Sequence, residues 1–112
     1  MERNWMRKLR GAQVAPVERE SEGVPYLSFP LLDESGLVSH GLSTRMGGVS
    51  RGCYASMNLS FTRGDDPDHV AENYRRMAGA LHVDPERMVL SYQTHTVNVR
   101  KVTEEDCGKG IL

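Results

Sequence analysis

The sequence predicts an α+β fold in which a mixed β-sheet packs against one main helix, over about residues 67–82. Three patterns support this prediction. Two strand-like runs flank a turn within residues 26–44, apolar residues recur at helical spacing within residues 67–82, and strand-like runs follow at 88–102. A chain of 112 residues is long enough for one domain with a modest core.

The first 23 residues are polar, mixed in charge and without a sustained period, so we expect a loosely held N-terminal arm over 1–23 and the domain proper over 24–112. Residues 26–32 and 37–44 are each typical of a strand. Asp33-Glu34-Ser35-Gly36 between them is a turn signal, which predicts a hairpin over 26–44. Pro30 indicates an edge strand or an early end.

The helix has the clearest signals. Asp66 is a good N-cap, Pro67 suits the first helical position, and Asp68 adds negative charge where the helix dipole favours it. One face of the helix is apolar and is therefore expected to contact the core. Its members are Val70, Tyr74, Met77, Ala78 and Leu81.

The remaining segments suggest further strands. Residues 57–61 and 88–92 are each typical of a short strand. Val97, Val99 and Val102 predict another over 97–102, with a bulge at Arg100-Lys101 where the alternation slips.

Composition excludes several classes of protein. The net charge of −1 gives no electrostatic footprint for nucleic acid, and no apolar run approaches the roughly 20 residues of a membrane span. The basic N-terminus lacks the apolar region of a secretion signal, which favours a cytoplasmic location. Cys53 and Cys107 form no CxxC pair, so we expect two free thiols.

A glycine-rich loop follows the second predicted strand and is the strongest functional signal. It carries Ser43, Arg45, Gly47 and Gly48. Glycines allow backbone N–H groups to come close to a ligand, and an arginine offers a planar fork of donors suited to phosphate or carboxylate. The loop could therefore hold an anion; the competing interpretation is a glycine-rich turn with a solvated arginine.

Other polar residues have simpler interpretations. His69 is expected to be solvated, His82 to end the helix and His40 to be structural, whereas His95 is either a turn residue or part of a site. Asp65 and Asp66 are expected to cap the helix, and no base lies near either cysteine in the sequence. No local cluster of metal ligands is visible.

Four blocks, taken in order, resemble the laccase-domain or polyphenol-oxidase-like (YfiH-like) family, whose members are associated with purine nucleoside phosphorylase activity. The resemblance covers about residues 37–112. The blocks are His40-Gly41-Leu42-Ser43-Thr44-Arg45-Met46-Gly47-Gly48-Val49-Ser50, then Tyr54-Ala55-Ser56-Met57-Asn58-Leu59, then Gly64-Asp65-Asp66 with Val70-Ala71-Glu72-Asn73-Tyr74-Arg75, then Gln93-Thr94-His95.

The resemblance implies a zinc ion held by two histidines and one cysteine. The first histidine belongs to a Q-x-H motif and corresponds to His95, while the A-D-C-x-P and H-A-G-W-R-G motifs of the other ligands do not occur in this sequence. Cys107 has neither the flanking residues nor the spacing of the missing ligand. One imidazole cannot complete a zinc site, so the sequence resembles the N-terminal part of such an enzyme, an incomplete half of an α/β/β/α fold.

For the complete enzyme, the resemblance implies phosphorolysis of adenosine, inosine and guanosine, with adenosine deamination and methylthioadenosine cleavage as further activities. Copper is less expected than zinc, because one mixed site is not a multi-copper arrangement. In this sequence we expect catalytic roles for Ser43 and Arg45, substrate or phosphate binding by Arg45, Gly47, Gly48, Asn58 and Gln93, and metal binding by His95.

Two alternatives stay open: a non-catalytic anion- or nucleoside-binding module, and a truncated, inactive fragment. The half-fold should also expose a sheet edge. We therefore expect dimerisation, a loose fold or aggregation of the isolated fragment. Its expected partner is a second copy or a complementing C-terminal half.

Overall fold

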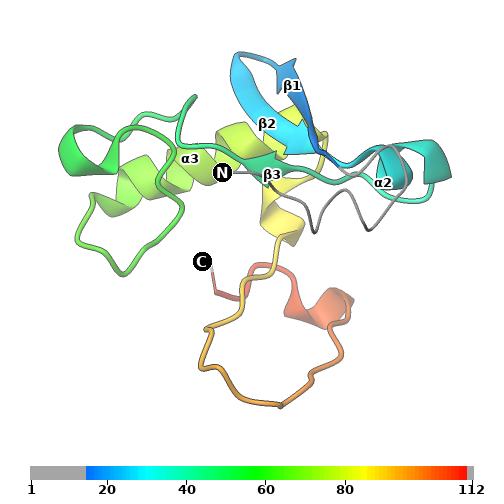
Figure 1. Ribbon diagram of the computed structural model, residues 1–112. Helices are drawn as coiled ribbons and strands as arrows, with labels where there is room; N and C mark the ends of the chain where they lie inside the picture. Colours follow the sequence, from blue (N-terminus) through cyan, green and yellow to red (C-terminus); the bar gives the residue numbers. More distant parts are fainter. Residues whose placement is uncertain (1–14, 111–112) are drawn as a thin grey trace, which may run out of the picture.

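The computed structural model describes residues 15–110 of the chain. Figure 1 shows a small sheet lying against the long helix α3 (Pro67–Leu81). The sheet order is β1-β2-β3, from β1 (Val17–Ser21), β2 (Val24–Ser28) and β3 (Leu42–Ser43). The α+β class is confirmed. Both strand pairs are antiparallel, where a mixed sheet was expected.

The first hairpin lies earlier in the chain than predicted. Residues 17–21, assigned above to the polar arm, form β1 and pair with β2 across a two-residue turn at Glu22 and Gly23. Both turn residues have positive φ, 51° and 79°, which matches the twist of a tight hairpin. The rest of the predicted arm, residues 1–14, lies outside the described residues.

The predicted hairpin over 26–44 is wrong in its middle, because residues 30–35 form the short helix α2 (Pro30–Ser35). Pro30 occupies the first helical turn, where its fixed φ suits a helix, and Gly36 ends α2 in the left-handed region at φ 66°. The two flanking runs still pair as expected, although over two residue pairs only: Tyr26 with Ser43 and Leu27 with Leu42.

The predicted main helix is confirmed as α3, ending at Leu81. Its N-cap is Asp66, whose side chain accepts a hydrogen bond from Asp68 N, as expected. The core lies between α3, β2 and the segment after the glycine-rich loop. It consists of Val24, Met57, Met77 and Ala80, with Tyr26, Leu59 and Leu81 packed at its border.

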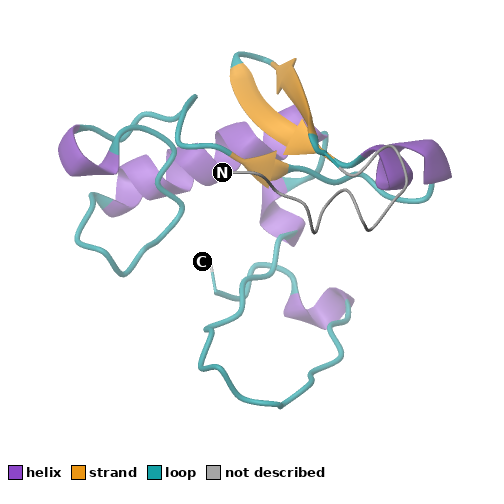
Figure 2. Ribbon diagram, in the orientation of Figure 1, coloured by secondary structure: helices purple, strands orange, loops and turns teal. Residues whose placement is uncertain are grey.

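The strands predicted at 57–61, 88–92 and 97–102 do not form. Figure 2 shows the chain after α3 as loop, apart from the 3-10 turns at Pro85–Arg87 and Glu104–Asp106. A strand needs a neighbour for its backbone hydrogen bonds, and the described residues offer none along 91–102. The side chains of Val97 and Val99 are each 96% exposed.

Two backbone hydrogen bonds close this C-terminal segment on itself: Leu90 N donates to Lys109 O, and Gly108 N donates to Met88 O.

No helix among residues 15–110 has the length and apolarity needed to cross a membrane.

Candidate anion-binding site

The glycine-rich loop is closed by hydrogen bonds to the segment that follows it. The carbonyl of Arg45 accepts from Ser56 N at 2.7 Å and from Met57 N at 2.9 Å, and Ser50 N donates to Ser56 O at 3.0 Å. The backbone of Arg45 is therefore held in place while its side chain stays exposed.

Helix α3 contacts the same loop through Asn73, which is completely buried. Its Oδ1 accepts from Val49 N at 2.8 Å. Its Nδ2 donates to Ser50 Oγ at 2.9 Å and to Asn58 O at 2.8 Å. One side chain thus joins the helix to the two segments that form the site.

Gly48 has a packing role. A Cβ at this position would lie 2.1 Å from Ser56 O and 2.6 Å from Asn73 Oδ1, so only glycine fits. Its N–H donates to Ser56 Oγ at 3.1 Å and is therefore already engaged. Gly47, at φ 94°, makes the turn, and its carbonyl accepts from Arg76 Nη1 at 3.2 Å.

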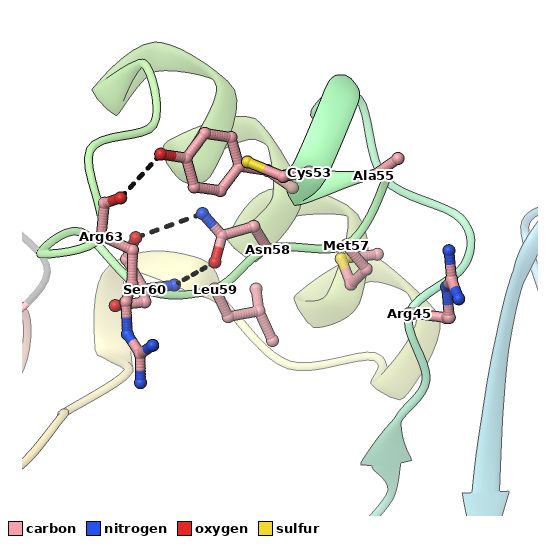
Figure 3. Close-up of a pocket in the computed structure, with 9 residues that line it drawn as sticks. Arg45, Cys53, Ala55, Met57, Asn58, Leu59, Ser60 and Arg63 are labelled. Atoms are coloured by element: carbon pink, nitrogen blue, oxygen red, sulfur yellow. Dashed lines mark hydrogen bonds between the residues drawn. The ribbon is translucent and has the colours of Figure 1, made fainter.

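Beside this loop lies a cavity of about 710 Å³. Figure 3 shows Arg45 and Arg63 on opposite sides of the residues that line it. Within residues 15–110, neither guanidinium forms an ion pair with a carboxylate. The other lining residues are Cys53, Tyr54, Ala55, Met57, Asn58, Leu59 and Ser60.

A polar network fixes the residues between the two arginines. Asn58 Oδ1 accepts from Ser60 N at 3.1 Å, and Asn58 Nδ2 donates to Asp65 Oδ2 at 3.1 Å. The Tyr54 hydroxyl donates to Arg63 O at 2.7 Å and so anchors the backbone of the second arginine. These bonds position the lining residues before any ligand arrives.

Two groups of this network have pKa values that are shifted in opposite directions. A hydrogen bond from Ser50 Oγ, at 2.5 Å, is the largest cause that holds the pKa of Asp65 below its usual value, and Asn58 adds to it. Asp65 is therefore a carboxylate at neutral pH, 6% exposed. Burial raises the pKa of Tyr54, which stays a neutral hydroxyl. The two charged residues that line the cavity are Arg45 and Arg63.

Of the predicted site residues, the structure brings together Arg45 and Asn58 in this cavity. Ser43 lies in β3, opposite Tyr26, and does not line it. The backbones of Gly47 and Gly48 support the loop. Gln93 and His95 lie in the exposed segment 91–103, which Figure 1 shows extending away from the sheet and from the glycine-rich loop.

Sequence reasoning missed Arg63 as a site residue. It precedes Gly64, so the criterion that selected Arg45, an arginine near glycines, could have found it. Ser60, Tyr54 and Cys53 were also not selected, because nothing local in the sequence shows that the chain folds back to place them opposite Arg45.

The remaining polar residues are largely structural. His82 is the C-cap of α3 in the left-handed conformation, as expected, and His40 Nε2 accepts a hydrogen bond from Phe29 N at 2.9 Å. Asp65 does not cap the helix through its own side chain in the way Asp66 does; it holds Ser50 and Asn58 instead. Cys53 and Cys107 are free thiols.

The described part of the chain contains no group of three histidine, cysteine or acidic side chains that could hold a metal ion. A zinc site takes about three or four protein ligands. The donors of residues 15–110 therefore do not fit the zinc ion that the family resemblance implies. His95 could supply one ligand only if other donors came from elsewhere.

Comparison with known proteins agrees with the expected family. Residues 39–111 match the family described as multi-copper polyphenol oxidoreductase laccase. A purine nucleoside phosphorylase from Deinococcus radiodurans is 44% identical over 77 residues, which are 69% of this chain and 28% of that protein. Purine nucleoside phosphorylase YfiH from Escherichia coli is 46% identical over 63 residues, 56% of this chain and 26% of that protein.

The fold has a similar counterpart of known structure. The crystal structure of YlmD from Geobacillus stearothermophilus superposes with a TM-score of 0.74 at 34% sequence identity, covering 87% of this chain and 35% of that one. The chain thus spans about a quarter to a third of the length of the relatives it matches.

Proposed function

Because this chain belongs to the multi-copper polyphenol oxidoreductase laccase family, we propose that it is the N-terminal part of a purine nucleoside phosphorylase and that it supplies the phosphate pocket. The observation that carries the proposal is the pair of guanidinium groups, Arg45 and Arg63, on either side of one cavity. Two exposed cations without a carboxylate partner among the described residues favour a doubly charged anion such as phosphate.

Phosphorolysis of a nucleoside needs a bound phosphate, which the two arginines at the cavity would supply. In phosphorolysis, a phosphate oxygen forms a bond to C1′ of the ribose while the bond from C1′ to the base nitrogen breaks, and the base leaves with the electron pair. Arg45 and Arg63 would hold the phosphate by charge-assisted hydrogen bonds, and the cavity would orient one of its oxygens toward the sugar. Ser60 also lines the cavity, and its hydroxyl would contact the phosphate or the ribose, while the engaged amide of Asn58 holds the backbone beside it.

From the family resemblance we infer that the complete enzyme depends on zinc, lies in the cytoplasm and turns over adenosine, inosine and guanosine. Adenosine deamination and methylthioadenosine cleavage are the further activities that the resemblance implies. His95 is our candidate for one zinc ligand.

The same observation favours a second candidate, a module that binds phosphate or a nucleoside without turning it over. It needs the arginine cavity but no metal. The two candidates differ in whether inosine and phosphate are converted to hypoxanthine and ribose 1-phosphate.

Phosphate binding to the 112-residue chain, measured by isothermal titration calorimetry, tests the shared part of both candidates. We expect Arg45→Ala and Arg63→Ala each to weaken binding about tenfold or more, since a hydrogen bond to a charged group contributes about 1.5–3 kcal/mol. Arg51→Ala is the matched control, because Arg51 is an exposed arginine of the same segment that does not line the cavity.

An unchanged phosphate affinity in the double variant Arg45→Ala/Arg63→Ala would overturn the proposed pocket. Release of hypoxanthine from inosine only when phosphate is present, by the chain joined to or mixed with a C-terminal part, would favour the enzyme over the binding module.

A further inference from the structure

The three-stranded sheet has a second face, opposite the one that α3 covers (Figure 1). Side chains along a strand point alternately to the two faces of a sheet. In β2, Val24 and Tyr26 belong to the core beside α3, so Pro25 and Leu27 lie on the other face. We call this second face the outer face.

The strand register adds residues from β1 and β3 to the outer face. Glu18 pairs with Leu27 and Glu20 pairs with Pro25, while Leu27 pairs with Leu42 on its other side. Paired residues of neighbouring strands point to the same face, so Glu18, Leu27 and Leu42 form one row across the sheet. The outer face therefore consists of an apolar strip with two carboxylates along one side.

The outer face is hollowed and open. A cavity of about 490 Å³ lies on it. Leu42 is 52% exposed, and Met46, which follows β3, is 56% exposed. The residues that line the cavity are Glu18, Arg19, Glu20, Pro25, Tyr26, Leu27, Thr44 and Met46. Exposed apolar side chains gathered around a hollow and rimmed by charged ones are typical of a binding surface.

The charge of the outer face is negative. Arg19 lines the cavity, but its guanidinium group donates to Ser28 Oγ at 3.0 Å and to Asp33 Oδ2 at 3.2 Å and is therefore engaged elsewhere. Within residues 15–110, neither Glu18 nor Glu20 forms an ion pair. An occupant of this face should therefore combine apolar side chains with positive charge.

The chain itself carries a segment of this composition, residues 1–14, which precede the described part of the structure. Its apolar side chains include Trp5, Met6 and Leu9. Its charged residues are four basic ones, Arg3, Arg7, Lys8 and Arg10, and one acidic one, Glu2. We propose that the outer face binds this segment of its own chain, with the apolar side chains on the strip and the basic ones beside Glu18 and Glu20.

The connection of the chain makes this occupant easy to place. Residue 15 leads into β1, whose first residue, Val17, pairs with Ser28 directly beside the row that contains Leu27 and Leu42. Neighbouring strands are about 4.8 Å apart, and each residue of an extended chain spans up to about 3.3 Å. A few residues therefore suffice to cross the sheet, and the covalent link gives the segment a high effective concentration at the face.

A second copy of the chain fits the outer face less well. In a two-fold dimer the same patch meets itself, so Glu18 and Glu20 of both copies would enter one interface. Like charges brought together in an interface repel each other. The charge of the face thus favours the basic segment over a second outer face.

The test uses the fluorescence of Trp5, the single tryptophan of the 112-residue chain. In the native chain, Trp5 should emit at a shorter wavelength and be quenched less by acrylamide than in the chain unfolded by urea. Leu42→Glu places a charge in the apolar strip, and Glu18→Lys/Glu20→Lys reverses the charge beside it. We expect each variant to shift both readings most of the way to those of the unfolded chain, while circular dichroism shows that α3 is still formed.

Matched controls make the same chemical changes away from the outer face. Leu37→Glu alters a leucine that is 86% exposed and does not line the cavity. Glu34→Lys/Glu86→Lys reverses two exposed carboxylates that also lie outside it. Both control variants should give the readings of the wild type.

A charge swap tests the contact directly. Arg7→Glu/Arg10→Glu should shift the readings as Glu18→Lys/Glu20→Lys does, and the combination of all four substitutions should restore the readings of the wild type, because opposite charges then face each other again.

Three results would overturn the proposal. The first is a Trp5 that is as exposed in the native wild type as in the unfolded chain. The second is a set of outer-face variants that stay folded and keep the readings of the wild type. The third is a set of readings that change with protein concentration, because a second copy would then cover Trp5.

Discussion

The side-chain amide of Asn73 donates a hydrogen bond to Ser50 Oγ over 2.9 Å, and both groups are buried. This bond connects the middle of α3 to the end of the glycine-rich loop. Ser50 Oγ in turn donates to Asp65 Oδ2, which also accepts from Asn58 Nδ2 at the arginine cavity. The helix therefore sets the position of the site through a chain of polar contacts.

Removal of the Asn73 amide should destabilise the fold strongly. In Asn73→Ala the N–H of Val49 and the carbonyl of Asn58 lose their partner in the interior. Because buried unsatisfied polar groups cost about 1–3 kcal/mol each, we expect a loss of about 2–4 kcal/mol in the free energy of unfolding, measured by urea denaturation. Asn98→Ala, in the exposed segment, should change it by less than about 0.5 kcal/mol. An equal effect at both positions would contradict the role of Asn73.

Alanine substitution at two glycines should have opposite effects. Gly48→Ala places a Cβ 2.1 Å from Ser56 O, so the loop must shift, and we expect a loss of about 1–3 kcal/mol. Gly79→Ala meets only the flexible end of Glu22, at 3.3 Å, and should stabilise α3 by up to about 1 kcal/mol. Thermal unfolding followed by circular dichroism measures both effects. A Gly48→Ala variant that unfolds at a higher temperature than the wild type would contradict the close contact between position 48 and Ser56 O.

Stability in acid should depend on Asp106. Hydrogen bonds from Lys109 Nζ, at 2.7 Å, and from Thr103 N, at 2.9 Å, lower its pKa from 3.8 to about 2. A lowered carboxyl pKa in the folded state stabilises the protein fully above pH 3.8, and this contribution is lost as the pH falls from 3.8 through about 2.

Urea denaturation of the wild type and of Asp106→Asn between pH 5 and pH 2 measures this contribution. The difference in stability between the two proteins should shrink as the pH falls below about 4. Glu105→Gln removes one negative charge at the neighbouring exposed position and is the control. A difference that stays constant over this range would contradict the assignment.

The exposed valines should make the chain self-associate. Val97 and Val99 are each 96% exposed, in a segment whose alternation is typical of a strand. Such a segment can pair with another chain. We expect light scattering after size exclusion to show dimers or larger species that grow with concentration. Val97→Ser/Val99→Ser should reduce them, whereas Val97→Ile/Val99→Ile should retain them. A compact monomer at high concentration in the wild type would contradict this expectation.

Local signals in the sequence predicted the structure correctly where a few adjacent residues determine it. Asp66 and Pro67 set the start of α3, and the apolar spacing of Val70, Tyr74 and Met77 set its buried face, because a helix makes its hydrogen bonds within itself. The family resemblance also came from the sequence, since its four blocks lie in order along the chain. The fold class and the place of Arg45 beside a candidate anion site followed from these signals.

Only the tertiary structure decided which segments became strands and which residues share a cavity. A strand bonds to a partner remote in sequence, so residues 17–21 formed β1 with β2 beside them, whereas 97–102, with a better alternation, stayed a loop. Arg63 faces the same cavity as Arg45 because Tyr54, Asn58 and Asn73 fold the intervening chain back on itself. Contacts between such distant residues leave no local pattern from which a sequence could predict them.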